Sequence, residues 1–161
     1  MLGIGQGYDI HRLVEGRPLR LGCIEVPFEL GALGHSDGDA AAHALCDALL
    51  GAAGLGDMGL LFPSSDARWK DASSATFLSE VASRLAASGA RVVSADVTIV
   101  LEKPALAPHF AAMRSAMASV LGIDAATLSV KAKSSDGLGP VGEGNAVAAL
   151  AVALVEMPSR S

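Results

Sequence analysis

The stretch GHSDGDAAAHALCDALLGAAG, residues 34–54, decides the fold of this chain because it contains its clearest helix. From Asp37 to Gly54 the sequence is rich in Ala and Leu and has no proline, which favours a helix. Asp37 or Asp39 could cap its start, since a carboxylate accepts hydrogen bonds from the first free backbone amides. The pattern therefore predicts a helix with His43 in its second turn.

Two polar residues, Asp9 and His11, precede this helix in the sequence. Residues two apart on a strand leave the same face, so both side chains would point toward one ion. With His43 they would form a three-ligand site for zinc or another divalent metal, open at the fourth position. The alternative is that Asp9 and His11 are surface polar residues at a strand end and His43 is a hydrogen-bonded core histidine. Three candidate ligands in one short region favour the metal site.

The composition bounds the architecture and the partners. A chain of 161 residues fits one domain, 1–161. Hydrophobic residues make up 51% but aromatic residues only 4%, so Ala, Val and Leu must fill the core. Small side chains bury little area each, and burying a further apolar face between subunits would add stability. We therefore expect a homo-oligomer.

The charge and the remaining composition exclude several classes of partner. The net charge is −5 and no basic run occurs, so nucleic acid is not an expected partner. Two cysteines, Cys23 and Cys46, do not make a disulfide framework. The N-terminus lacks a basic region followed by an apolar one, and no apolar run reaches the length of a membrane span. We expect a cytoplasmic protein without a membrane partner.

The remaining pattern alternates strands and helices. The last apolar stretch, 145–154, is compatible with a helix by its Ala content and with a strand by its Val and Leu positions, and we favour a strand. The fold class that follows is α+β, an α/β sandwich in which one mixed sheet is covered on one face by helices. We expect a strand at 2–8, a hairpin at 18–28, a loop at 54–66, a helix at 72–88, a strand at 91–101, a helix at 108–121, a strand at 128–132 and a loop at 134–144.

Five motifs in a fixed order resemble one known family. They are GQGYDIHRL from Gly5, GHSDGDAAAHALCDALLGA from Gly34, LGDMGLLFP from Leu55, DVTIV from Asp96 and KPALAPH from Lys103. Together they resemble the 2-C-methyl-D-erythritol 2,4-cyclodiphosphate synthases of the non-mevalonate isoprenoid pathway. The resemblance implies a homotrimer around a central axis with active sites between adjacent subunits. It also implies a phosphorus-oxygen lyase that closes 4-diphosphocytidyl-2-C-methyl-D-erythritol 2-phosphate into a cyclic diphosphate and expels CMP.

The same resemblance assigns roles to the polar residues. Asp9, His11 and His43 would hold Zn2+, with a β-phosphate oxygen at the open position. Mg2+ or Mn2+ would bridge the α- and β-phosphates through Asp136, where the family usually has Glu. His35 and Ser36 would hold the methylerythritol phosphate end.

The transition state and the remaining subsites are assigned in the same way. His35 would also stabilise the transition state, unless it is only a cap at the helix entry, and Ser134 stands where the family has a catalytic threonine. The implied substrate-binding residues are Asp9, His11, His35, Ser36, Asp57, Met58, Gly59, Phe62, Ser64, Ser65, Asp66, Lys133, Ser134, Ser135 and Asp136, together with Leu101, Pro104, Ala105, Leu106 and Ala107, which would frame cytosine from the neighbouring subunit.

The last quarter of the chain departs from the family pattern. KAKSSD at 131–136 replaces the usual KATTTE, and LGPVGEG at 138–144 leaves no counterpart for the family's phenylalanine and arginine. Lys133 is our hypothesis for the missing positive charge. We expect Asp37, Asp39 and Asp47 to cap helices and orient the ligands rather than bind metal.

Two other functions are compatible with this sequence. A zinc-dependent phosphate-ester hydrolase would use the same three ligands to activate water, and would need a general base near the open position. A non-enzymatic oligomeric binding protein would instead have structural zinc closed by a fourth protein ligand.

Overall fold

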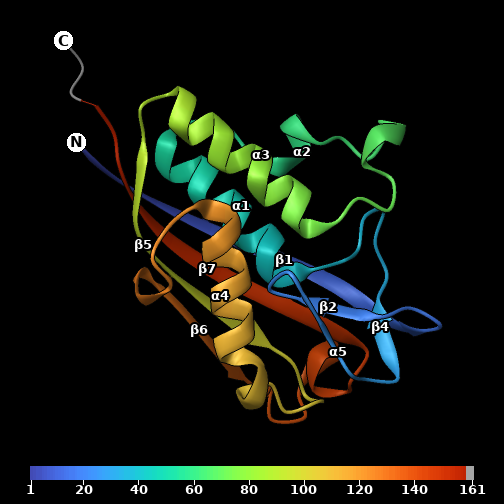
Figure 1. Ribbon diagram of the computed structural model, residues 1–161. Helices are drawn as coiled ribbons and strands as arrows, with labels where there is room; N and C mark the ends of the chain where they lie inside the picture. Colours follow the sequence, from blue (N-terminus) through green and yellow to red (C-terminus); the bar gives the residue numbers. More distant parts are fainter. Residues whose placement is uncertain (159–161) are drawn as a thin grey trace.

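A five-stranded mixed sheet forms the centre of the computed structural model, which describes residues 1–158 (Figure 1). The strand order is β4-β1-β7-β5-β6, antiparallel except for the parallel pair β5–β6. A separate hairpin joins β2 to β3. The strands are β1 (Leu2–Glu15), β2 (Leu19–Leu21), β3 (Ile24–Val26), β4 (Leu30–Ala32), β5 (Arg91–Val100), β6 (Leu128–Lys133) and β7 (Ala146–Glu156).

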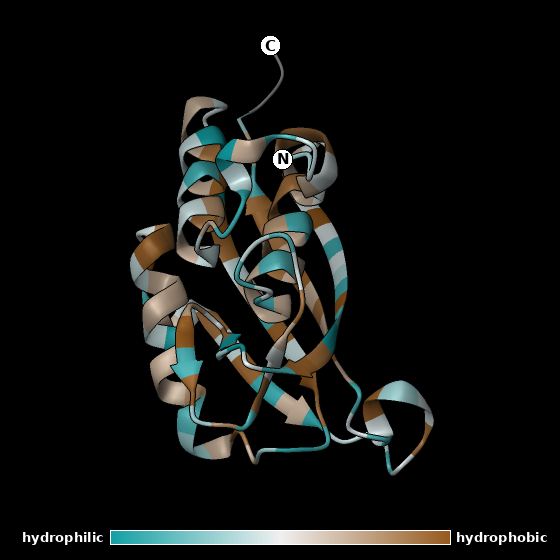
Figure 2. Cartoon of the chain, turned by 90° about the vertical axis from the view of Figure 1, so that its right-hand side faces the viewer, coloured by the Kyte–Doolittle hydropathy of each residue, from teal (hydrophilic) through white to brown (hydrophobic). Residues whose placement is uncertain are grey.

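Three long helices cover one face of this sheet, and Figure 2 shows them on one side when the molecule is turned by 90°. They are α1 (Ala40–Ala53), α3 (Ser74–Ala87) and α4 (Phe110–Leu121). The short α2 (Met58–Leu61) follows α1, and the short α5 (Gly139–Gly142) lies on the opposite face, where Val141 packs against Ala146, Ala148 and Val100. Three 3-10 turns complete the described elements, at Ala67–Trp69, Ala107–His109 and Ala125–Thr127.

Three glycines of β1 let α1 lie directly on the sheet. A Cβ at Gly3, Gly5 or Gly7 would lie about 2 Å from a carbonyl oxygen of α1, at Ala52 (2.1 Å), Ala48 (1.9 Å) and Ala44 (1.9 Å) respectively. Four helical residues rise about 6 Å and two strand residues about 6.7 Å, so one turn of α1 matches two residues of β1. The helix therefore runs antiparallel along the glycine face of β1.

The opposite face of the sheet is apolar and exposed over β1 and β7. Ile4 is 75% exposed, Tyr8 55% and Val152 47%. The register places Ile4 beside Leu154 and Tyr8 beside Leu150, so these side chains form one continuous surface. Exposed apolar patches of this kind mark interaction surfaces.

The sequence prediction of the fold class is confirmed, with differences in detail. The predicted hairpin and the strand over the last apolar stretch are present, so the helix alternative for 145–154 is wrong. The first strand continues to Glu15, and α1 begins at Ala40 rather than at Asp37 because Asp39 caps it. The loops predicted at 54–66 and 134–144 each contain a short helix, and β4 was not predicted.

Candidate metal centre

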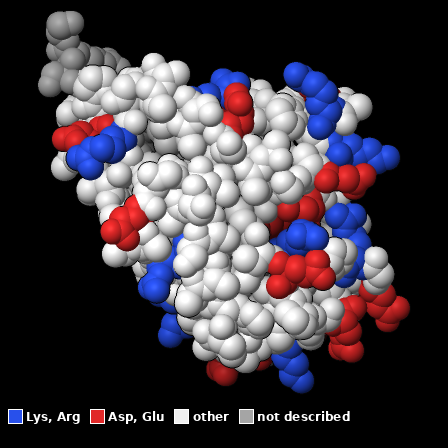
Figure 3. Space-filling model, in the orientation of Figure 1, with Lys and Arg blue, Asp and Glu red and all other residues white. Residues whose placement is uncertain are grey.

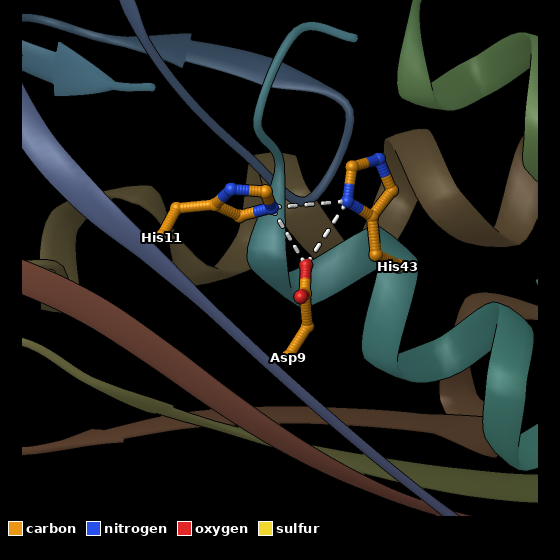
Figure 4. A group of neighbouring side chains, drawn as sticks. All are labelled: Asp9, His11 and His43. Carbon is orange, nitrogen blue, oxygen red and sulfur yellow. Dashed lines mark hydrogen bonds and ion pairs between the residues drawn. The ribbon is translucent and has the colours of Figure 1, made fainter. Parts of the chain in front are cut away.

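Asp9, His11 and His43 converge on one point, as the sequence predicted (Figure 4). The Oδ2 atom of Asp9 lies 2.8 Å from Nε2 of His11 and 3.0 Å from Nδ1 of His43. The two imidazole nitrogens are 3.4 Å apart. Two imidazole nitrogens and a carboxylate oxygen in one cluster are a donor set that suits zinc.

The backbone elements set this geometry. Asp9 and His11 continue the face of β1 that carries Gly3, Gly5 and Gly7, so they follow directly beyond the region where α1 lies on the strand. His43 is the fourth residue of α1, at the end of its first turn rather than in the second. Close packing of α1 on β1 thus brings a helical imidazole over two strand side chains.

Each imidazole has a second contact that orients its ring. Nδ1 of His11 donates a hydrogen bond of 2.9 Å to the carbonyl of Leu33, which leaves Nε2 facing the cluster, with a proton for Asp9 or, in the neutral ring, a lone pair for a metal. Nε2 of His43 lies 3.4 Å from Oγ of Ser36 and 3.8 Å from a carboxylate oxygen of Asp37, so Nδ1 is the nitrogen that faces the cluster. Both rings therefore present a nitrogen to the same point.

Asp9 and His11 shift each other's pKa. Burial raises the pKa of Asp9, but hydrogen bonds from His11 and His43 lower it more, so the pKa lies well below its usual value of 3.8. Burial lowers the pKa of His11, but the hydrogen bond with Asp9, the negative charge of Asp9 and the hydrogen bond to Leu33 together raise the pKa above 6.5. The carboxylate is thus negative and available to a cation.

The loop that leads into α1 is fixed by the two aspartates that we expected to cap and orient. Asp39 is fully buried, caps α1 through the amide of Ala42 and also accepts hydrogen bonds from the amides of Gly22 (2.8 Å) and Cys23 (2.7 Å). Asp37 accepts a hydrogen bond from the amide of Ser74 at 2.6 Å. The alternative that His35 caps the helix is wrong, because Asp39 occupies that position.

Ser36 and His35, the two residues before Asp37, differ in exposure. Ser36 is buried beside His43, whereas the side chain of His35 is exposed. Both lie in the loop that contacts the cluster through Ser36. We call Asp9, His11, His35, Ser36 and His43 the metal half-site.

The loop after α1 is attached to the same helix. Asp57 caps α2, and the amide of Met58 donates a hydrogen bond of 2.8 Å to Asp47, which lies one turn after His43. Burial raises the pKa of Asp47. Farther along, Ser64 and Ser65 are exposed, and Asp66 caps the 3-10 turn at Ala67–Trp69. This segment therefore lies beside the metal half-site but does not enter the cluster.

Phe77 is a contact that the sequence did not reveal. Its ring meets that of His43 edge to face, with centroids 5.7 Å apart, and packs against Phe62 and Trp69 at 5.0 and 5.6 Å. Trp69 thus anchors its loop. Phe77 is one of several apolar residues of α3, and nothing in its spacing distinguishes it.

The other sequence-predicted residues form a second group, which we call the strand-end loops, residues 101–107 and 133–136. Parallel pairing of β5 with β6 brings their ends together. The amide of Leu101 donates to the carbonyl of Lys133 at 2.9 Å, and the amide of Ser135 to the carboxylate of Glu102 at 3.3 Å. Among residues 1–158, no side-chain hydrogen bond or ion pair joins these loops to the metal half-site, and Asp136 is not part of the metal cluster.

Several expectations about single residues are also resolved. Both cysteines are free, and Cys46 is buried, with its pKa raised by that burial. Lys131 pairs with Asp96 on the open face of the sheet.

Charged side chains of both signs are scattered over the face shown in Figure 3, without a continuous basic surface. In the described part of the chain, no helix is long and apolar enough to cross a membrane.

Comparison with known proteins gives consistent matches over almost the whole chain. Residues 2–156 match the model of the YgbB family. The 2-C-methyl-D-erythritol 2,4-cyclodiphosphate synthase of Gloeobacter violaceus is 54% identical over 153 residues, 95% of this chain and 94% of that protein. The enzyme of the same name from Desulfosudis oleivorans is also 54% identical, over 94% of this chain and 90% of its own length.

Solved structures give the same result. A 2C-methyl-D-erythritol-2,4-cyclodiphosphate synthase in a CDP-bound form superposes with a TM-score of 0.87 at 44% identity, covering 95% of this chain and 99% of that one. The bifunctional IspDF from Campylobacter jejuni superposes with a TM-score of 0.94 at 34% identity. It covers 99% of this chain, which spans 43% of the length of that larger protein.

Proposed function

This chain belongs to the YgbB family, and we propose that it is a 2-C-methyl-D-erythritol 2,4-cyclodiphosphate synthase, a phosphorus-oxygen lyase of the non-mevalonate isoprenoid pathway. In this reaction the 2-phosphate of 4-diphosphocytidyl-2-C-methyl-D-erythritol 2-phosphate attacks the β-phosphorus. The bond to the CMP oxygen breaks, and the cyclic diphosphate and CMP leave. The observation that carries the proposal is the convergence of Asp9, His11 and His43 in a chain that is 54% identical to synthases over nearly its whole length.

The three clustered side chains fit the zinc ion that we propose. In the neutral ring, Nε2 of His11 has a free lone pair because Nδ1 donates to Leu33, and the carboxylate of Asp9 is ionised at neutral pH. Three protein ligands leave a position for a substrate oxygen. Zinc held there would supply a Lewis acid next to the phosphorus that is attacked. We propose Mg2+ or Mn2+ at Asp136 as the second ion.

The residues of the chain would carry out the positioning that ring closure needs. Two anionic phosphates repel each other, so holding them close and neutralising their charge is most of the catalysis. His35 and Ser36 would hold the 2-phosphate, and His35 would stabilise the transition state. The 57–66 segment would hold the sugar alcohol. Its position next to α1, through the contact between Met58 and Asp47, supports this assignment.

The strand-end loops would act from a neighbouring subunit. Residues 101–107 would frame cytosine and residues 133–136 would bind phosphate, with Ser134 at the transition state. Among the described residues, no side-chain hydrogen bond or ion pair joins these loops to the metal half-site, which supports a site shared between copies. The exposed apolar face of β1 and β7 supports the homotrimer that would build it. We further propose a single domain over residues 1–161, of which 159–161 lie outside the described residues, and a cytoplasmic location.

Product analysis tests the proposed function. The purified protein is incubated with the diphosphocytidyl substrate, zinc and magnesium, and the products are followed by phosphorus NMR. A synthase yields the cyclic diphosphate and CMP in equal amounts. A linear phosphate product would instead establish the hydrolase, and no turnover in the metal-loaded protein would favour a binding protein with structural zinc.

A further inference from the structure

Arg17 lies in the turn between β1 and β2, and its backbone is held tightly in place. Its carbonyl oxygen would lie 2.2 Å from a Cβ at Gly31, and that of Pro18 2.4 Å away, so β4 packs directly on this turn. Only glycine fits at Gly31. The side chain of Arg17 therefore starts from a fixed position next to the loop that leads into α1.

The guanidinium group of Arg17 is directed at that loop. Nη2 donates a hydrogen bond of 2.8 Å to the carbonyl of Ser36, and Nε is buried without a hydrogen-bond partner among residues 1–158. The arginine–carboxylate pairs among residues 1–158 are formed by Arg20, Arg68, Arg84 and Arg91. Arg17 is thus a partly buried cation that no described carboxylate neutralises.

Among the described residues, the Ser36 carbonyl accepts its hydrogen bond from Arg17 alone. The 71–72 segment binds the same loop: the carbonyl of His35 accepts a hydrogen bond of 2.9 Å from the amide of Asp71. The amide of Asp37 donates to the carbonyl of Ala72 at 3.2 Å. Arg17 thus supplies the contact from the β1–β2 turn that fixes the peptide group between Ser36 and Asp37.

We propose that Arg17 is a positioning residue that holds the His35–Ser36 segment for the 2-phosphate of the substrate and adds positive charge behind it. A partly buried cation without a counterion is costly, and a bound phosphate monoester would complement it. Arginine suits this position because its planar group can keep one hydrogen bond to a carbonyl and remain charged. This inference rests on the proposed function, because it requires a phosphate at His35 and Ser36.

The test compares Arg17→Met, Arg17→Gln and Arg17→Lys with the wild type. The measured quantities are KM and kcat for the full substrate, the affinity for CDP by calorimetry, and bound zinc. CDP lacks the 2-phosphate, so it reports the rest of the site. Arg20→Met is the matched control, since Arg20 is in the adjacent hairpin and pairs with Glu25.

The proposal predicts a selective loss. Arg17→Met should raise KM about tenfold or more, as expected for loss of a charge-assisted hydrogen bond, while CDP affinity and zinc content stay near wild type. Arg17→Lys should recover part of the loss, and Arg17→Gln less of it, because glutamine can donate but has no charge. Arg20→Met should match the wild type.

Two results would overturn the inference. One is an unchanged KM in Arg17→Met, or in Arg17→Gln if the methionine variant does not fold. The other is an equal loss of substrate and CDP affinity, which would indicate a purely structural role. Failure of the proposed function is distinguishable, because the wild type itself would then form no cyclic product.

Discussion

The metal half-site and the strand-end loops differ in how completely one chain builds them. In the metal half-site, Asp9, His11 and His43 contact one another within 3.4 Å, and Asp37, Asp39 and Phe77 support the elements around them. In the strand-end loops, Lys133, Ser134 and Asp136 are exposed, and the side chain of Asp136 has no described partner. One chain therefore brings the three metal-binding side chains together, whereas no described side-chain hydrogen bond or ion pair joins the strand-end loops to them.

Removal of a metal ligand from the metal half-site should have the largest effect on activity. His43→Ala takes away one of three ligands, and turnover should fall about 1,000-fold or more together with zinc content. Zinc is measured by atomic emission and turnover by CMP release. His109→Ala, which changes the histidine outside the site and its loop, should keep a full complement of zinc. Full activity in His43→Ala would contradict the assignment of the metal half-site.

A methyl group at the interface between helix and strand should be the next largest perturbation. Gly7→Ala would place a Cβ 1.9 Å from the carbonyl oxygen of Ala44 and push α1 away from β1. Such overpacking should cost about 3 kcal/mol in the free energy of unfolding and weaken zinc binding. Urea denaturation measures the first quantity and a zinc titration the second.

Gly51 provides the matched control, because a Cβ there meets only Gly5 Cα at 3.9 Å. Gly51→Ala should be neutral or stabilise the protein by about 0.5–1 kcal/mol, since alanine favours the helix. If both variants behave alike, close packing at Gly7 is not what positions His43.

In the strand-end loops, Lys133→Ala tests whether this lysine replaces the family's arginine. Loss of its charge should raise KM for the substrate about fivefold, with kcat and zinc content near wild type. Lys131→Ala, whose charge already pairs with Asp96, should change KM less than about twofold. An unchanged KM in Lys133→Ala would show that the substrate phosphate is neutralised elsewhere.

The smallest effect concerns pH in the metal-free protein. Asp9 has a lowered pKa, so its contribution to stability is present above 3.8 and is lost as the pH falls through the folded-state pKa. His11 has a raised pKa, so its contribution is full below 6.5 and is lost as the pH rises through the folded-state pKa.

Stability from this pair should therefore be greatest between pH 3.8 and 6.5 and should fall toward alkaline pH. Urea denaturation in the presence of a chelator measures it, with Asp9→Asn as the control in which this dependence should be reduced. A wild type and variant with the same pH profile would contradict the coupling of Asp9 with His11.

The sequence predicted the metal ligands because their signal is local. The spacing of Asp9 and His11 on a strand, and the helix that follows Asp39, are short-range patterns. Phe77 and Arg17 were not predictable in this way. Phe77 looks like any other apolar residue of α3, and no motif around Arg17 points to its contact with Ser36.

The fold was predictable to a similar extent. Periodicity identified most elements, yet strand order and the short β4 depend on long-range pairing that no local pattern encodes. Glycine by itself weakens a strand, and only the packing shows that the glycines of β1 admit α1. The roles of the strand-end loops came from the family resemblance alone. The contacts of these loops within one chain do not show a binding site.

Mixing two inactive variants tests most directly whether the two regions meet only between copies. His43→Ala lacks the metal half-site, and a variant with both Ser134→Ala and Asp136→Ala lacks the strand-end loops. The two are denatured, mixed in equal amounts and refolded, and CMP release is measured. If sites form between subunits, about a quarter of them combine intact halves, so the mixture should recover up to about a quarter of wild-type activity. A mixture no more active than either variant alone would contradict the shared site.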